Sequence, residues 1–173
     1  MRALVVYESM FGNTRDLALA IADGLTARGA LVDLVTADSA PEDFPERVEL
    51  LVVGAPTHAF SLPKHQTRVD AARRSGGGPL VSHGDGVREW IERVRLDKGQ
   101  PTATFDTKVE RPRLPGSAAR AAARRLRDQG ATIIGTQTFH VDGTEGPLTS
   151  GETVRACAWA GGLIVDAAIH RVG

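Results

Sequence analysis

The sequence predicts an α/β fold in which a mostly parallel sheet is covered by helices on both faces. Short apolar runs rich in valine are typical of strands buried on both faces of such a sheet. Between them lie stretches with apolar residues at three- and four-residue steps, which predict helices. The two kinds of segment alternate in the order βαβ(α)βαβαβα, and this alternation indicates parallel strands joined by helical crossovers.

The first half of the chain contains three predicted strands. Residues 3–7 form a continuous apolar run that suits a strand buried on both faces, and residues 50–55, the most apolar run of the protein, suit a central strand. Residues 31–35 alternate, which predicts a strand exposed on one side or at an edge. Helical spacing over residues 17–25 predicts a helix that Gly29 closes.

The segment after the third strand has a weaker pattern. Residues 68–74 mix arginine with small apolar residues, which fits one short polar helix. Residues 76–79 read Gly-Gly-Gly-Pro and predict a mobile surface loop. Residues 87–96 carry an apolar stripe typical of a helix, and residues 102–106 are rich in β-formers and predict a fourth strand.

The last third of the chain completes the alternation. Two prolines in residues 111–116 exclude regular structure there, because proline lacks a backbone donor. Residues 117–128 form a predicted helix with an inner stripe of alanine, and Gly130 stands where a helix C-cap belongs. Residues 131–141 predict the fifth strand and residues 150–169 the last helix.

Length and composition fit a single domain over residues 1–173. The chain is 42% hydrophobic and 24% charged, and it shows neither a repeat nor a separate linker. Lys plus Arg and Asp plus Glu each number 21, a balance that argues against nucleic acid as a partner and against a strongly acidic carrier. One cysteine excludes an internal disulfide framework, and the histidines show no metal-ligand spacing, so we expect no metal site.

The apolar segments also bear on location. None approaches the length of about 20 residues that a membrane span requires. The apolar stretch that follows Met1 is too short for a signal peptide, and no small-residue cleavage site follows it. We therefore expect a soluble, cytoplasmic protein.

The loop after the first strand is the most informative candidate site. Ligands of an open α/β sheet bind beyond the carboxyl ends of the strands, which directs attention to the loops after Tyr7, Ala55 and Phe105. The first loop places Ser9 and Thr14 at a helix start, where hydroxyls and free backbone N–H groups make an anion site. It contains no Lys or Arg, so it suits a phosphate monoester held by hydrogen bonds and the helix dipole. Alternatively, a side chain of this loop, Ser9 or Asn13, only caps the helix.

Residues 5–14 read VVYESMFGNT and, with Ala18 and Ile21, resemble the signature of the flavodoxin family. The order of predicted elements matches that family along nearly the whole chain. The segment TEGPL at residues 144–148 also resembles uncharacterised bacterial flavodoxin-domain proteins. The resemblance implies a flavodoxin-like three-layer sandwich, with a five-stranded parallel sheet of order 2-1-3-4-5 that binds flavin mononucleotide (FMN).

The resemblance also implies which residues contact the cofactor. The first loop would hold the ribityl phosphate through Ser9, Met10, Phe11, Gly12, Asn13 and Thr14. The second loop would cover the isoalloxazine ring through Pro56, Thr57, His58, Ala59 and Phe60. Phe60 or His58 would supply the ring contact; alternatively, Phe60 is a core anchor.

The third loop departs from the family pattern. We expect it to contribute Phe105, Asp106 and Thr107, but the tyrosine that often stacks on the flavin there is missing, since the single tyrosine is Tyr7. Phe105 either replaces it or points into the sheet, which would leave the outer ring face open to a substrate or partner. This loop is made basic by Lys108, Arg111 and Arg113. Either these side chains are only solvated, or they tune the reduction potential of the flavin or bind an anionic partner.

The leading interpretation is a flavoprotein that transfers electrons through bound FMN to a redox partner protein, with no catalytic side chain. Carrier flavodoxins are typically acidic and this chain is neutral, which keeps open an FMN-dependent oxidoreductase that acts on a quinone or a similar small-molecule electron acceptor. A flavodoxin-fold interaction domain without flavin is the third alternative.

Overall fold

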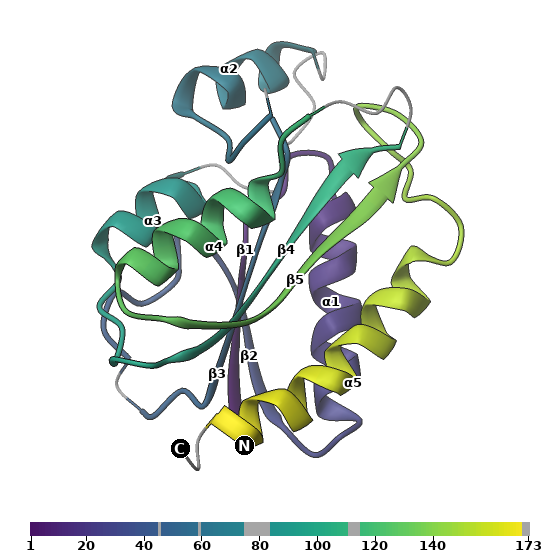
Figure 1. The fold of residues 1–173 in the computed structure, drawn as a ribbon. Coiled ribbons are helices and arrows are strands. Elements are labelled where there is room, and N and C mark those ends of the chain that lie inside the picture. The colour runs from purple at the N-terminus through teal and green to yellow at the C-terminus, as the bar shows by residue number, and fades with distance from the viewer. Residues whose placement is uncertain (45, 59, 75–83, 111–114, 171–173) are drawn as a thin grey trace.

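The computed structural model describes residues 1–44, 46–58, 60–74, 84–110 and 115–170. Five parallel strands form one sheet in the order β2-β1-β3-β4-β5 (Figure 1). This confirms the fold class and the strand order predicted from the sequence. The strands are β1 (Arg2–Tyr7), β2 (Leu31–Thr36), β3 (Leu50–Pro56), β4 (Pro101–Val109) and β5 (Thr132–Val141).

Helices cover both faces of the sheet. One face carries α1 and α5, the other carries α3 and α4, and α2 lies apart at the carboxyl edge of the strands (Figure 1). The predicted loop at residues 76–79 lies outside the described residues, as do Ala59, Arg111 and Arg113. The helices are α1 (Asn13–Thr26), α2 (His65–Arg74), α3 (Val87–Arg93), α4 (Ala118–Asp128) and α5 (Glu152–His170).

The two faces have separate hydrophobic cores because successive side chains of a strand point to opposite sides. In β1, Val5 packs in the core beneath α1 and α5, and Val6 packs in the core beneath α3 and α4. Strands β1 and β3 are buried on both faces, as their apolar runs predict. The partly exposed β2 lies at one edge of the sheet, as its alternation predicts.

Several element ends differ from the prediction, and tertiary contacts explain the end of α3 and the end of β4. Helix α3 ends at Arg93 and not at residue 96, because Val94 is extended and the Arg95 N–H donates to the carbonyl oxygen of Glu42 at 2.8 Å. Strand β4 continues past residue 106 because its end pairs with β5, Val109 facing Val141.

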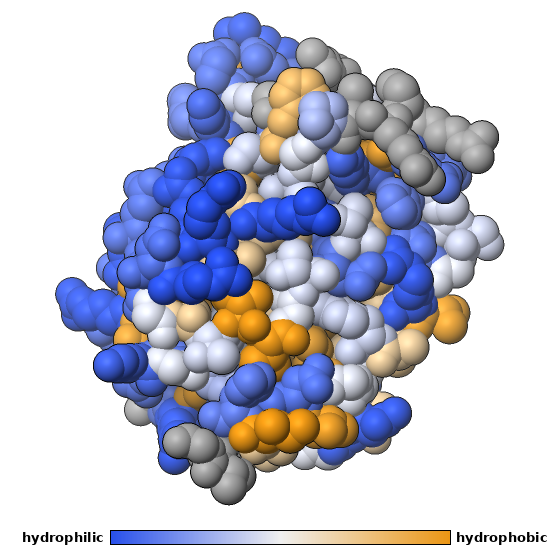
Figure 2. Space-filling model, in the orientation of Figure 1, coloured by the Kyte–Doolittle hydropathy of each residue, from blue (hydrophilic) through white to orange (hydrophobic). Residues whose placement is uncertain are grey.

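The surface is mixed in character. Figure 2 shows hydrophilic residues over α2, α3 and α4, and a hydrophobic area between α4 and α5. Helix α4 exposes Arg120, Arg124 and Arg127. Among the described residues, no helix is long and apolar enough to cross a membrane.

Candidate functional site

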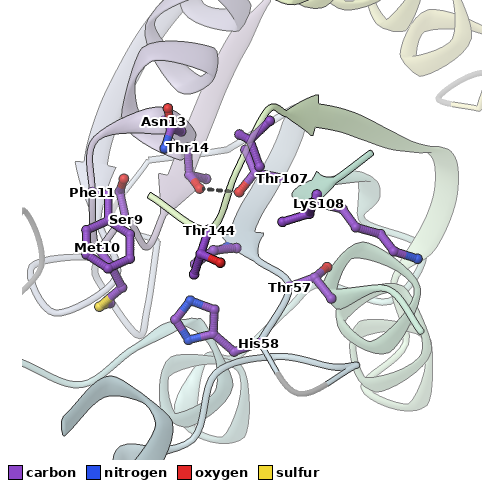
Figure 3. Close-up of a pocket in the computed structure, with 13 residues that line it drawn as sticks. Ser9, Met10, Phe11, Asn13, Thr14, Thr57, His58, Thr107, Lys108 and Thr144 are labelled. Carbon is purple, nitrogen blue, oxygen red and sulfur yellow. Dashed lines mark hydrogen bonds between the residues drawn. The ribbon is translucent and has the colours of Figure 1, made fainter. Parts of the chain in front are cut away.

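The loops after β1 and β3 and the carboxyl ends of β4 and β5 surround one cavity at the carboxyl edge of the sheet (Figure 3). The cavity has a volume of about 60 Å³. Both hydroxyl and apolar side chains line it, and none of the lining residues is acidic. The lining residues are Ser9, Met10, Phe11, Asn13, Thr14, Pro56, Thr57, His58, Thr107, Lys108, Val109, Val141 and Thr144.

The first loop opens directly into helix α1. Gly12 is the N-cap residue and adopts a left-handed φ of 94°, which glycine accepts without a steric cost. Its N–H donates to the Ser9 hydroxyl oxygen at 3.1 Å. The N-cap residue itself has no side chain to cap the helix, and the contact of Ser9 with the Gly12 N–H keeps the interpretation of Ser9 as a cap open beside that of an anion site. The first N–H groups of α1 precede its hydrogen-bond ladder, which begins with the bond from Asp16 to the Gly12 carbonyl oxygen.

Thr14 joins this loop to the end of β4. Its Oγ1 atom lies 3.0 Å from that of Thr107, and both residues are buried (Figure 3). Either hydroxyl can donate, because a hydroxyl is donor and acceptor at once. The pair therefore leaves one hydroxyl hydrogen at the cavity wall free to donate to a ligand.

Asp106 acts behind the cavity and does not line it. The carboxylate is fully buried, and its Oδ2 atom accepts hydrogen bonds from the Thr57 hydroxyl at 2.9 Å and the Ser117 hydroxyl at 2.6 Å. The N–H of Ala119, in the first turn of α4, donates to the same oxygen at 3.0 Å. Asp106 thus ties the second loop to α4, and within the part of the chain that is described its Oδ1 atom has no partner.

The second loop forms a tight turn beside the cavity. His58 and Ser61 exchange two backbone hydrogen bonds, of 2.9 and 3.0 Å. Phe60 has a left-handed φ of 70° and a side chain that is 53% exposed. A side chain this exposed is no core anchor, so that alternative for Phe60 is wrong. The backbone of Phe60 lies against Gly116, where a Cβ atom would overlap the Phe60 carbonyl group.

Phe105 lies away from the cavity, which corrects its inclusion among the flavin contacts. Its side chain is fully buried beneath α1 and α5 and meets the Phe139 ring edge-on, with centroids 6.3 Å apart. The ring fills the space above Gly54, where a Cβ atom would overlap it. Phe105 therefore points into the sheet, which was the alternative interpretation.

Sequence reasoning missed the segment after β5. Thr144 lines the cavity, and the amide nitrogen Nδ2 of Asn13 donates to the Glu145 carbonyl oxygen at 2.9 Å. The segment folds back on β5 through a bridge between Val141 and Leu148. The signal for it in the sequence was the TEGPL motif, whose resemblance to flavodoxin-domain proteins did not show where the segment lies.

Lys108 is the described member of the predicted basic loop. Its Nζ atom donates to the Gly116 carbonyl oxygen at 2.8 Å, and in Figure 3 the amine extends away from the other lining side chains. The alkyl chain lines the cavity while the charge reaches the loop that supports Phe60. Lys108 therefore contributes a cation to the rim.

A buried carboxylate, Glu8, lies directly before the first loop. Burial raises its pKa, while the Arg68 guanidinium and the N–H of Val87 lower it by smaller amounts. Glu89 shares the same arginine. Burial raises its pKa most, but the hydrogen bond and charge of Arg68 together with backbone N–H groups outweigh burial, so that the pKa of Glu89 is lowered. The site thus has a charged network behind it that the sequence pattern did not indicate.

Residues 5–75 match the model of the flavodoxin family. Over these residues the chain is similar to that family. The match includes the first loop and the second loop, and it confirms the resemblance seen in the sequence. No curated protein matches the chain.

Solved flavodoxins share the fold over almost the whole length of the chain. Oxidised flavodoxin 1 from Bacillus cereus has a TM-score of 0.69 at 15% identity and covers 95% of this chain and 98% of its own. An archaeal flavodoxin has a TM-score of 0.65 at 17% identity, and the match covers 97% of this chain and 99% of the archaeal one. The two-electron reduced flavodoxin from Megasphaera elsdenii has a TM-score of 0.59 at 21% identity, and the match covers 92% of this chain and 98% of that flavodoxin. At these identities the likeness shows the flavodoxin fold.

Proposed function

We propose that this flavodoxin-like protein binds FMN and transfers electrons through it. The observation that carries the proposal is the cavity at the start of α1, where threonine and serine hydroxyls meet the N-terminus of a helix and no acidic side chain lines the wall. Such a donor set fits a phosphate group. When bound, the isoalloxazine ring would supply the redox chemistry, and the protein supplies binding, orientation and electrostatics.

The size of the cavity supports the same assignment. A water needs roughly 10–15 Å³ of such space, so about 60 Å³ suits a group the size of phosphate. A hydrogen bond from the Thr14–Thr107 hydroxyl pair and hydrogen bonds from the first turn of α1 would hold that group. The ring is assigned to the rim, where the turn between His58 and Ser61 supplies an exposed aromatic side chain.

The conformation of Phe60 supports a ring contact at this turn. A non-glycine residue with left-handed φ is held there at a cost of roughly 1–3 kcal/mol, and such strain is concentrated at ligand clamps and active sites. A half-exposed phenyl ring at the tip of such a turn offers a stacking surface. His58, which lines the cavity beside it, is the second candidate for contact with the ring.

Titration of the purified, flavin-free chain with FMN and with riboflavin tests the proposal. Because riboflavin lacks the phosphate, FMN should bind at least tenfold more tightly, and inorganic phosphate should compete with FMN. A chain that binds neither flavin would contradict the proposal and favour an interaction domain. Stopped-flow reduction of the FMN-loaded protein by NAD(P)H, with and without a quinone, then distinguishes a carrier from an oxidoreductase.

A further inference from the structure

A buried ion-pair network lies directly behind the candidate site. Glu8 follows the last residue of β1, precedes Ser9 and is fully buried. Its Oε1 atom lies 3.3 Å from Nη1 of Arg68, which is only 8% exposed although it belongs to α2. The Glu8 Oε2 atom accepts a hydrogen bond from the N–H of Val87, at the start of α3, at 3.0 Å. One carboxylate therefore connects the first loop with two helices.

The same arginine extends the network to α3. Its Nη2 atom lies 2.8 Å from Oε1 of Glu89, and the other oxygen of Glu89 accepts from the N–H of Gly86 at 3.0 Å. Gly86 allows this close approach, because a Cβ atom there would overlap the Glu8 carboxylate and the Arg68 guanidinium. A residue with a side chain at position 86 would therefore displace the charged groups.

The network also reaches the end of the second loop. Arg68 Nη1 lies 3.5 Å from the Pro63 carbonyl oxygen. Arg88, on α3, donates to the same oxygen at 3.1 Å and to the Leu62 carbonyl oxygen at 2.7 Å. Leu62 and Pro63 follow the turn that ends at Ser61, so the two arginines hold the base of that turn. The first and second loops are thereby attached to one buried network.

A buried ion pair is a poor source of stability, since desolvation offsets most of its attraction. Well-packed apolar residues of similar volume are often equally stable or better, whereas the loss of one partner is costly. Where such a pair is retained beside a ligand site, conformational specificity is a physical reason for it. In this protein the pair joins the two loops that form the site.

We propose that Glu8 and Arg68 are positioning residues that hold the first loop and the turn between His58 and Ser61 in the single arrangement that binds the flavin. The proposal rests on FMN binding and adds α2, through Arg68, to the architecture of the site. It predicts that the two loops lose their order together when the pair is removed, even where the fold keeps its stability.

A double-variant design separates positioning from stability. Arg68→Met leaves Glu8 buried without its partner, so we expect a lower melting temperature and an FMN affinity at least tenfold weaker. Glu8→Gln combined with Arg68→Met removes both charges of the fully buried pair and leaves only Glu89, whose side chain is 25% exposed, so the melting temperature should return toward that of the wild type. FMN affinity should stay at least tenfold weak in this double variant, because the loops are no longer attached to each other. Riboflavin affinity should fall as well.

Three controls complete the experiment. Arg68→Lys keeps the charge but loses the two-pronged contact, so its FMN affinity should be intermediate. Arg93→Met removes an exposed arginine of α3, paired with Glu42 and Asp85, and should leave FMN affinity unchanged. Amide hydrogen exchange of the flavin-free full chain should rise over residues 9–14 and 57–63 in the double variant. This readout requires no flavin.

The outcomes distinguish this inference from the proposed function. If the wild type binds no flavin, the proposed function fails, and hydrogen exchange alone decides whether the pair couples the loops. If the double variant binds FMN as tightly as the wild type and its exchange is unchanged, the pair is only structural and the inference is overturned. Recovered melting temperature with persistently weak FMN binding and faster exchange in both loops supports it.

Discussion

The hydroxyl oxygens of Thr14 and Thr107 lie 3.0 Å apart at the wall of the cavity, although 93 positions separate the two residues in the sequence. Thr14 stands in the first turn of α1 and Thr107 near the end of β4. The contact places a hydroxyl pair beside the N–H groups of the first turn of a helix. This relationship is the basis of the first prediction.

Thr14→Val keeps the shape of the side chain and removes its hydroxyl. We expect FMN affinity to fall about ten- to a hundredfold, since a hydrogen bond to a charged group contributes roughly 1.5–3 kcal/mol. Riboflavin affinity should hardly change, because riboflavin has no phosphate. Fluorescence titration of both flavins measures the two affinities. Thr104→Val is the matched control, because it removes a buried hydroxyl that lies 3.2 Å from that of Thr136, away from the cavity lining. If Thr14→Val weakened the binding of FMN and of riboflavin equally, the phosphate of FMN would not bind in this cavity.

Phe60→Gly separates backbone strain from ring contact. Glycine adopts a φ of 70° freely, so this variant should be at least as stable to heat as the wild type, whereas Phe60→Ala keeps the strain. Both variants should bind FMN less tightly, by roughly 1–3 kcal/mol if a stacked ring is lost. Differential scanning calorimetry and flavin titration provide the two measurements. Unchanged FMN affinity in both variants would show that the exposed ring does not touch the flavin, and would direct attention to His58.

Glu152 should make stability depend on pH. Burial raises its pKa, but hydrogen bonds from the Arg155 side chain at 2.6 and 2.9 Å and from the His140 N–H at 2.6 Å outweigh burial, so the pKa is lowered. A carboxyl group whose pKa is lower in the folded state stabilises the fold above its unfolded pKa, about 4.3, and loses this contribution as pH falls through the folded value.

Glu152→Gln should therefore destabilise the protein at pH 7 by roughly 1–3 kcal/mol and much less below pH 3. Thermal or urea unfolding of variant and wild type at the two pH values measures the difference. If the variant were less stable than the wild type by the same free energy of unfolding at both pH values, the charge of the Glu152 carboxylate would not contribute to this contact.

Lys108→Met tests whether the cation at the rim tunes the flavin. A nearby positive charge favours the more negative, reduced cofactor, so its loss should lower the reduction potential. If the Lys108 charge stabilises the reduced flavin by about 0.5 kcal/mol after solvent screening, the reduction potential of a one-electron couple shifts by roughly 20 mV. Potentiometric titration at low and moderate salt measures the shift, which should shrink with salt. Lys98→Met, which changes an exposed lysine before β4 at the opposite edge of the sheet, should leave the potential where it is. A Lys108 variant with the same potential as the wild type at low salt would show that the charge acts only on Gly116.

Local patterns in the sequence determined the order and type of the elements and the position of the first loop. A strand buried on both faces needs an unbroken apolar run, and a helix on a sheet needs apolar residues every three or four positions, so both leave a signal within a short window. Glycine and hydroxyl residues between residues 9 and 14 predicted an anion site for the same reason, because a helix N-terminus supplies the donors without help from distant segments.

Pairing between distant segments decided the element ends and the direction of side chains. Strand β4 extends to Val109 because β5 pairs with it, and α3 stops where Arg95 bonds to Glu42. Phe105 and Thr107 are both next to Asp106, yet Phe105 is sealed in the core while Thr107 reaches the cavity. The difference arises where the sheet ends, since a side chain inside the sheet is covered by a helix and one at its edge is not.

Only the tertiary structure brought together the residues behind the site. Arg68 meets Glu8 across 60 positions of sequence, and Asn13 meets Glu145 across 132. Neither contact repeats with a helical or strand period, so neither leaves a local signal. An ionic group becomes a buried partner only when the fold has excluded water around it, and that exclusion is a property of the packed chain and not of any segment of it.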